Sequence, residues 1–190
     1  MDSSDSAQET PTVRLPDDWR TGRIEAVHEL AWRDLLDLVP GTAQALADLA
    51  AEQTGTTATG LARDTAVRFN GGCGSDLFLV CRECDADRAV IEIKGPQAAM
   101  NPNKDDIWQT AVYQDAYQAD PALACGHFPG ISPLFILLDA RNRSRQAIEQ
   151  KEGAYIPLSL DGWAVLTYEE VLTRAPFKDQ PLARWLLACC

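Results

Sequence analysis

The sequence predicts an α/β protein in which a mixed β-sheet is flanked by helices. Three observations carry this prediction. Apolar residues recur at helical spacing early in the chain, the period becomes strand-like near residue 63, and "SPLFILLDA" at 132–140 is a near-continuous apolar run. Such a run is typical of a strand buried on both faces, and helices alternating with strands form layers around one sheet.

The length and composition indicate one domain. A chain of 190 residues with 46% hydrophobic content can bury a substantial core. Residues 1–19 are polar and acidic and predict a disordered or loosely attached arm, so the single domain is expected at 20–190. The N-terminus is unlike a signal peptide, and no apolar run approaches the roughly 20 residues that span a bilayer. We therefore expect a cytoplasmic protein with no membrane partner.

Two helices are expected first. Apolar residues recur at close to helical spacing from Ile24 to Leu38, and "VPG" ends this helix. A second helix fits residues 42–55, whose alanines favour close packing on a neighbour. Three short strands then fit the chain at 65–70, 75–81 and 88–95. The last two flank a turn, "RECDAD", which predicts an antiparallel hairpin.

The second half of the chain alternates helices and strands. Residues 104–120 fit a helix, with Asn103 as its cap and Pro121 as its end. The step across this helix to the buried strand predicts a right-handed parallel crossover. The other expected elements are a loop and short helix at 141–154, a strand at 162–168, and closing helices at 169–174 and 181–190.

The charge of the chain limits how it can contact nucleic acid. With 28 acidic and 17 basic residues its formal net charge is -11. Broad electrostatic affinity for phosphate backbones is therefore excluded, because such proteins are basic. Any nucleic-acid contact has to be local, assisted by metal, or helped by a partner.

The cysteines form only one CxxC motif, made by Cys81 and Cys84. No second pair completes a four-ligand zinc pattern, and Cys73, Cys125 and His127 are isolated. Reduced thiols in the cytosol are thus favoured, and a structural zinc is not expected. A zinc-stabilised interaction domain built on the CxxC motif stays open as a third interpretation.

The strand at 88–95 combines an acid and a base on one face. Ile91 and Ile93 lie on one side of the strand, and Glu92 and Lys94 lie on the other, about 7 Å apart. Taken alone, this pattern also fits the solvated face of an edge strand. In the hairpin, however, Asp76 at the start of the preceding strand converges on Glu92. Two neighbouring carboxylates repel each other unless they share a proton or a cation, and Mg²⁺ prefers such oxygen ligands.

This arrangement resembles the catalytic core of the PD-(D/E)XK nuclease superfamily, which has the restriction-endonuclease-like fold. The family pattern is an acid at the start of one strand followed by acid-x-lysine on its hairpin partner, here Asp76 and Glu92-Ile93-Lys94. Gln109 and Tyr113 in the next helix resemble the Gln-xxx-Tyr motif of RecB-like members. The residue before the first acid is Ser75, where the family pattern has proline. This position varies widely in the family.

The resemblance implies a role for each of these residues. Asp76 and Glu92 would bind Mg²⁺ or Mn²⁺ together with the carbonyl of Ile93, and Lys94 would orient the attacking water. Gln109 and Tyr113 would orient the nucleic-acid strand or support the lysine. RecB-like members also take a ligand from an N-terminal helix, for which His28 is the first candidate and Glu29 the second.

The sequence also offers candidates for phosphate binding after the buried strand. The segment "RNRSR" places three arginines, Arg141, Arg143 and Arg145, at the end of this strand. One interpretation is that they bind phosphate, and the alternative is that they belong to a solvated loop. Lys104 is a lesser candidate.

The expected function is a metal-dependent nuclease that hydrolyses phosphodiester bonds, most readily in DNA, with single strands or ends weakly favoured by resemblance. The alternative is a non-catalytic nuclease-fold module that binds or assembles within a larger complex, which the acidic composition favours. The sequence leaves open whether the chain forms a homodimer or joins a larger protein complex.

Overall fold

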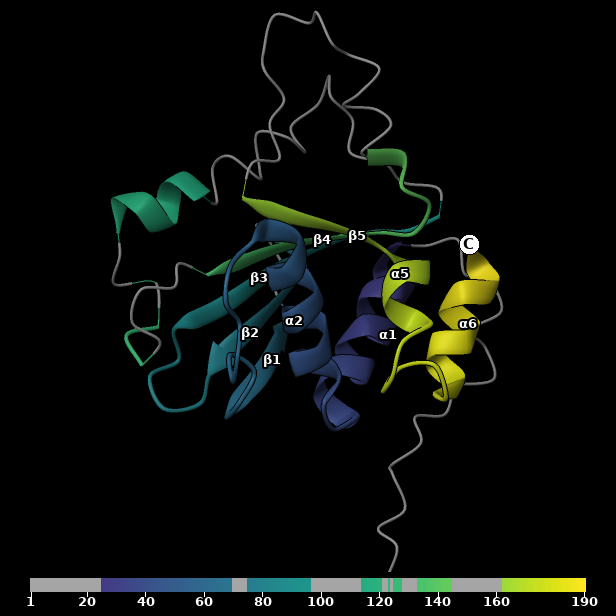
Figure 1. Cartoon of the computed structure of the whole chain (residues 1–190), viewed down its shortest axis with the longest axis horizontal. Coiled ribbons are helices and arrows are strands. Elements are labelled where there is room, and N and C mark those ends of the chain that lie inside the picture. Colours follow the sequence, from purple (N-terminus) through teal and green to yellow (C-terminus); the bar gives the residue numbers. More distant parts are fainter. Residues whose placement is uncertain are drawn as a thin grey trace, which may run out of the picture.

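The computed structural model describes residues 25–69, 75–96, 114–120, 123, 125–127, 133–144 and 162–190. Its centre is a five-stranded mixed sheet with helices packed on it (Figure 1). The predicted α/β class with a helix-flanked mixed sheet is therefore confirmed. The arm expected at 1–19 lies outside the described residues, and so do four candidate site residues, Lys104, Gln109, Tyr113 and Arg145.

The observed elements follow the expected order. Two helices, α1 (Glu25–Leu38) and α2 (Thr42–Thr54), precede the sheet. The strands are β1 (Thr65–Phe69), β2 (Leu77–Cys81), β3 (Asp87–Lys94), β4 (Leu134–Asp139) and β5 (Trp163–Thr167), and the chain closes with α5 (Tyr168–Leu172) and α6 (Pro181–Cys189). Residues 114–119 are also helical, within the helix predicted at 104–120.

The strands lie in the order β1-β2-β3-β4-β5. The first three are antiparallel neighbours, whereas β4 runs parallel to β3 and β5 runs parallel to β4. In the parallel register Glu92 lies beside Leu137 and Lys94 lies beside Asp139. Because β3 is the middle strand, its acid and base do not lie on an edge of the sheet.

Local chemistry sets the limits of several helices. Gly41, with φ of 84°, forms the turn between α1 and α2, and the Thr42 hydroxyl donates to the Leu35 carbonyl at 2.6 Å. The left-handed region that Gly41 occupies strongly favours glycine. At α5, Thr167 and Glu170 form a capping box that satisfies N–H groups at the helix start.

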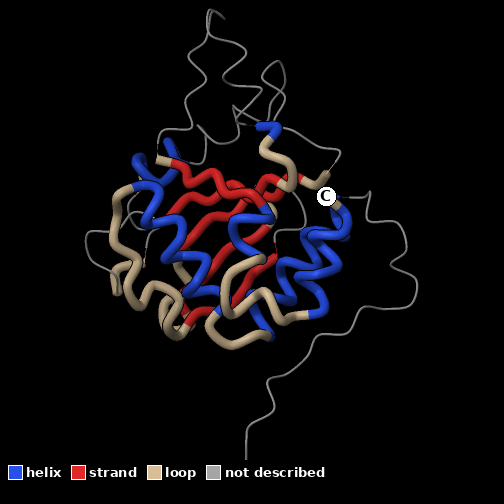
Figure 2. Tube along the Cα trace, turned by 45° about the vertical axis from the view of Figure 1, so that its right-hand side comes forward, coloured by secondary structure: helices blue, strands red, loops and turns tan. Residues whose placement is uncertain are grey.

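The two faces of the sheet pack against different elements. Alternate strand residues such as Ile91 and Ile136 form the main core with side chains of α1, α2, α5 and α6, and Figure 2 shows these helices in front of the strands. The opposite residues, including Val90 and Phe135, form a smaller core to which Tyr117 of the 114–119 helix packs. Glu92 and Lys94 alternate with the residues of the main core.

The main core predicts a large difference between two leucines of α1. Leu35 is fully buried, whereas Leu38 is 49% exposed in the same helix. We expect Leu35→Ala to lower the free energy of unfolding by about 2 to 5 kcal/mol because it leaves a cavity, and Leu38→Ala by less than about 1 kcal/mol. Urea unfolding followed by circular dichroism measures both values. Equal losses for the two variants would contradict the observed orientation of α1.

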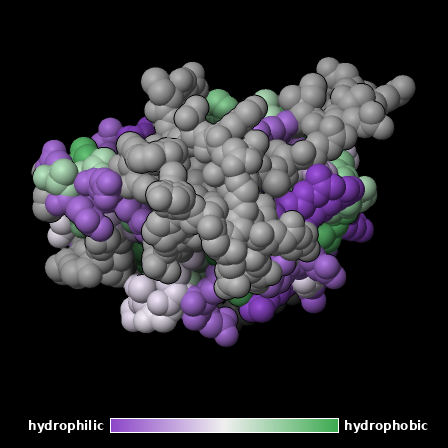
Figure 3. All heavy atoms as spheres, turned by 90° about the horizontal axis from the view of Figure 1, so that it is seen from above, coloured by the Kyte–Doolittle hydropathy of each residue, from purple (hydrophilic) through white to green (hydrophobic). Residues whose placement is uncertain are grey.

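Few large hydrophobic side chains are exposed among the described residues. Large hydrophobic side chains with substantial exposure are limited, among the described residues, to Leu38, Phe69 and Leu123. Figure 3 shows one face, where the described residues around the margin are largely hydrophilic with smaller hydrophobic areas between them. None of the helices within the described ranges has the length and apolar character needed to cross a membrane.

Candidate active site

The hairpin of β2 and β3 positions Asp76 against the end of β3. The pairing of β2 with β3 ends at Leu77 and Ile91, so Asp76 lies just beyond it. The Ile93 N–H donates to Asp76 Oδ2 at 2.7 Å. The carboxylate therefore takes the place of a ladder carbonyl and is held beside Glu92, as the sequence predicted.

Glu92 and Lys94 form a buried ion pair in the centre of the sheet. Lys94 Nζ donates to Glu92 Oε1 at 2.9 Å, and the two residues are 8% and 3% exposed. Side chains on a solvated strand face would be far more exposed. The alternative interpretation of this strand, as the solvated face of an edge strand, is therefore wrong.

Helix α1 adds two more carboxylates to this group. Glu25 Oε1 lies 3.5 Å from Lys94 Nζ, and the Glu25 Cα lies 3.7 Å from where a Cβ on Gly95 would be. Glu29, one turn further along the helix, acts electrostatically on Asp76 and is itself influenced by Glu92 and Lys94. The Lys94 ammonium thus contacts two carboxylates, and two more interact with this group electrostatically.

His28 lies in a different environment. It is fully buried, and its ring centroid is 5.7 Å from that of Tyr168 and 5.6 Å from that of Trp185. Its Cδ2 would be 3.7 Å from a Cβ on Gly95. Glu29, the second candidate on this helix, interacts electrostatically with Asp76 and Glu92.

Burial and mutual repulsion shift the protonation of the acids. Burial and the Glu92 carboxylate raise the pKa of Asp76 to about 8, although the Ile93 N–H opposes this. Burial raises the pKa of Glu29 above its ordinary value, and Glu25 and Glu92 add to the rise. Without a cation, Asp76 is therefore largely protonated at neutral pH.

The pKa of Lys94 is shifted in the opposite direction from that of an isolated buried lysine. Burial lowers the pKa of its ammonium, but the carboxylates of Glu92 and Glu25 outweigh burial and raise that pKa above its ordinary value. Lys94 is therefore protonated at neutral pH, and it can donate hydrogen bonds but cannot accept a proton.

The donor set fits a hard divalent cation. Asp76, Glu92 and Glu29 offer carboxylate oxygens, the ligand type that Mg²⁺ and Mn²⁺ prefer. Burial, and after it the Glu92 carboxylate, raise the pKa of Asp76, and an added cation would favour the ionised form of this acid. The acids therefore offer donors of the right type, but within the described residues their oxygens do not form a closely spaced ligand group as the cysteine–histidine cluster does.

Two of the predicted arginines follow the end of β4, beside the end of β3 that carries Lys94. The Ala140 N–H donates to the Lys94 carbonyl at 2.9 Å, which fixes the start of the segment after β4 beside the end of β3. The buried Asp139 then accepts the N–H groups of Arg141 at 3.1 Å and Ser144 at 2.6 Å. Arg141 and Arg143 are exposed on this turn.

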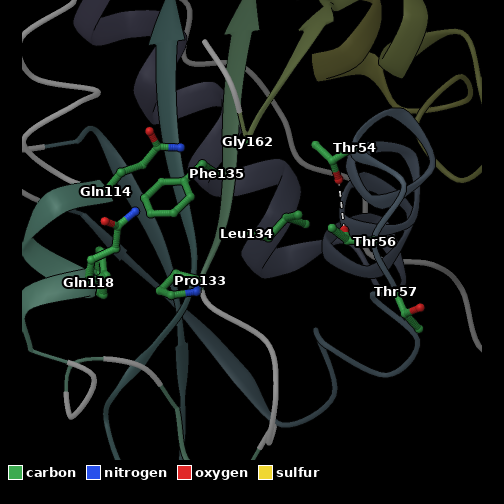
Figure 4. Close-up of a pocket in the computed structure, with 10 residues that line it drawn as sticks. Thr54, Thr56, Thr57, Gln114, Gln118, Pro133, Leu134, Phe135 and Gly162 are labelled. Carbon is green, nitrogen blue, oxygen red and sulfur yellow. Dashed lines mark hydrogen bonds between the residues drawn. The ribbon is translucent and has the colours of Figure 1, made fainter. Parts of the chain in front are cut away.

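A separate cavity of about 580 Å³ lies elsewhere, between the end of α2, the 114–119 helix and the starts of β4 and β5. Figure 4 shows Gln114 and Gln118 on one side of it and Thr54, Thr56 and Thr57 on the other. Its lining holds amides and hydroxyls but neither the acids nor the lysine described above. The cavity therefore offers no counterpart to their proton and metal chemistry.

The structure also gathers a set of side chains that the sequence left apart. Cys81, Cys84, Cys125 and His127 have ligand atoms within 4.8 Å of one another. The sequence did not predict a zinc site, because no second ligand pair accompanies the CxxC motif. In the folded chain, Cys125 and His127 lie next to this motif and form the second pair. The sequence signal that could have indicated this cluster is the CxxC motif followed by the Cys-x-His motif at 125–127.

Comparisons with protein-family models, with curated proteins and with solved structures find no match to this chain. Any functional conclusion therefore depends on the geometry and chemistry of these residues.

Proposed function

We propose that the chain is a Mg²⁺- or Mn²⁺-dependent nuclease with a restriction-endonuclease-like fold of the PD-(D/E)XK type. The observation that carries this proposal is the grouping of Asp76, Glu92 and Lys94 at the end of the middle strand, where Glu92 and Lys94 are buried and Asp76 is hydrogen-bonded to the strand that carries them. This set combines metal ligands with a cation that can stabilise developing negative charge.

The residues divide the work between binding and charge stabilisation. Asp76 and Glu92, with the Ile93 carbonyl, would hold the ion, and a further ligand would come from α1, either His28 or Glu29, of which Glu29 acts electrostatically on Asp76. The ion, when bound, polarises the phosphate and lowers the pKa of a bound water. Lys94 orients this water or stabilises the phosphate charge as a hydrogen-bond donor, since its pKa is raised.

DNA is the preferred substrate class in this proposal, with ends or single strands favoured weakly. Arg141 and Arg143 would bind backbone phosphate at the edge next to Lys94, together with Arg145 and Lys104. Gln109 and Tyr113 keep the strand-orienting role that the resemblance implies. Because the net charge of the chain is -11, contact with DNA has to be local and strongly dependent on the cation.

A second candidate is a non-catalytic module that binds or assembles within a larger complex. The acidic composition favours it, and so does Lys94, whose ammonium contacts both Glu92 and Glu25. Such a module would retain the fold without divalent-cation chemistry.

A cleavage assay with Mg²⁺ or Mn²⁺ tests the proposal. Single-stranded and double-stranded DNA and RNA are incubated with the full chain and with the variants Asp76→Ala and Lys94→Ala. We expect cleavage by the wild type only with the cation, and a loss of at least about a hundredfold in both variants. Lys178→Ala, at an exposed residue of the 173–180 turn, is the matched control and should cleave like the wild type.

The outcomes separate the two candidates. Equal cleavage by all four proteins would point to a contaminating nuclease and remove the assignment. Absence of cleavage on every substrate, together with no Mg²⁺ or Mn²⁺ binding by calorimetry, would favour the module.

A further inference from the structure

Three cysteines and a histidine converge at the opposite end of β3 from the candidate active site. Cys81 ends β2 and Cys84 lies in the turn before β3, whereas Cys125 and His127 precede β4. Their ligand atoms all lie within 4.8 Å of one another. We propose that these four residues form a closed structural zinc site.

Two of the distances between ligand atoms match tetrahedral coordination, and all of them are within 4.8 Å. Zn–S bonds of about 2.3 Å and Zn–N bonds of about 2.0 to 2.1 Å place sulfur atoms about 3.8 Å apart, and a sulfur about 3.6 Å from a nitrogen. Cys84 Sγ lies 3.6 Å from Cys125 Sγ, and Cys81 Sγ lies 3.5 Å from His127 Nδ1. A disulfide would bring two sulfurs to about 2.05 Å, and these cysteines are free.

The turn that holds the first two cysteines is closed by backbone hydrogen bonds. The Asp85 N–H donates to the Cys81 carbonyl and the Cys81 N–H donates to the Ala86 carbonyl, both at 2.9 Å. Asp85, with φ of 57°, lets the chain reverse directly after Cys84. The turn therefore holds the backbone of both cysteines on the same side of the strand end.

Arg88 supplies the charge balance. It is 7% exposed, and its guanidinium donates to Cys81 Sγ at 3.1 Å and to Cys125 Sγ at 3.4 Å, as well as to the carbonyls of Leu61 and Arg63. Zn²⁺ with three thiolates and a neutral histidine carries one negative charge, which the buried guanidinium neutralises. With neutral thiols, the same arginine would lose that compensation.

The histidine is also positioned to bind. Its Nδ1 lies 3.2 Å from Glu83 Oε2, and both side chains are substantially exposed, at 48% and 68%. Glu83 can therefore rotate into solvent when Nδ1 takes the metal. Binding releases the three thiol protons to solvent and involves no change of oxidation state.

The role of this site is to join two distant parts of the chain. The Cys125 N–H donates to the Asp87 carbonyl at 3.3 Å, and the Tyr117 hydroxyl donates to Asp87 at 2.5 Å, so the 114–127 region meets the start of β3 here. Four protein ligands leave no open position for a substrate, which is typical of structural zinc. The site therefore fixes β3 at the end opposite Glu92 and Lys94.

Metal analysis of the full chain tests the proposal. Protein purified without added metal and dialysed against metal-free buffer is expected to retain about one zinc per chain by mass spectrometry. Cys84→Ser and Cys125→Ser are expected to lose most of it. Cys189→Ser, the same substitution outside the cluster, and Asp76→Ala, in the candidate active site, are expected to retain it.

A second measurement uses only the wild type, in case the cysteine variants fail to fold. A mercurial reagent that modifies thiols should release the zinc, detected with a chromogenic chelator, and cobalt substitution should give the intense absorption of a tetrahedral thiolate site. Wild-type protein that carries no zinc and gives no such cobalt spectrum would overturn the proposal. So would bound iron with the visible absorption of an iron–sulfur cluster, or equal zinc loss in Cys189→Ser.

Discussion

Replacing Glu92 with glutamine is expected to lower cleavage by at least about a hundredfold and to destabilise the fold by about 3 to 5 kcal/mol. Glu92 is 3% exposed and accepts the 2.9 Å hydrogen bond from Lys94. A glutamine cannot balance the charge of the buried ammonium. The half-buried Glu25, at 3.5 Å, compensates for only part of the loss.

A second substitution separates the structural from the catalytic contribution. The double variant Glu92→Gln/Lys94→Met removes both charges, and it should recover most of the lost stability because no unpaired charge is left buried. It should not recover cleavage, since both the carboxylate and the ammonium are absent. The second substitution is thus expected to restore the stability of the fold but not the cleavage activity.

Urea unfolding and the cleavage assay measure the two effects on the same preparations. A double-mutant cycle that includes Lys94→Met alone gives the coupling energy directly. Wild-type cleavage by Glu92→Gln would remove this residue from the proposed site. A double variant no more stable than Glu92→Gln would contradict the ion pair as the source of the stability loss.

The stability of the metal-free protein is expected to fall as pH rises from about 4 to about 8, in part because of Asp76. The pKa of this group is raised from 3.8 to about 8 by burial and by Glu92. In this window the folded protein keeps the Asp76 proton and the unfolded chain has lost it, so rising pH favours unfolding. The contribution is complete below pH 4 and is lost by about pH 8.

The variant Asp76→Asn isolates this effect. Its amide oxygen can still accept the Ile93 N–H, but it does not titrate. The variant should resemble the wild type in stability near pH 4 and exceed it at pH 8 by an amount on the order of a few kcal/mol. Asp87, whose raised pKa arises from burial and from other neighbours, is common to both proteins and cancels in the comparison, whereas Glu29 and Glu92 interact with Asp76 and contribute to the difference.

Thermal unfolding between pH 4 and pH 9, without added divalent cation, measures the difference. Adding Mg²⁺ at pH 8 should then raise the melting temperature of the wild type more than that of Asp76→Asn, because binding to the folded state stabilises it. Parallel curves for the two proteins over the whole pH range would show that Asp76 does not titrate as expected.

The sequence predicted the secondary structure well because most of its signals are local. The alternation of Ile91 and Ile93 with Glu92 and Lys94 indicates a strand, and "RECDAD" indicates the hairpin that brings Asp76 close. Burial of the acid and the lysine could not be derived from this stretch. It depends on β4 pairing with β3, a contact between residues more than 40 positions apart.

Helix α1 shows a second limit. The helical period places Glu25 and Glu29 on one face, and it places His28 near the apolar stripe. Which of these faces meets the end of β3 depends on how the helix packs on the sheet. The position of His28 between Tyr168 and Trp185 involves rings from α5 and α6, at the far end of the chain.

The surplus of carboxylates around Lys94 imposes an order on events at the candidate site. With Asp76 protonated, the remaining acids Glu25, Glu29 and Glu92 still outnumber the single ammonium, and a nucleic acid would bring further negative charge. A phosphate arriving first would meet net repulsion, whereas a cation arriving first would convert the site from repulsive to attractive. We therefore expect sequential binding, in which the concentration of free divalent cation controls the association rate of the nucleic acid.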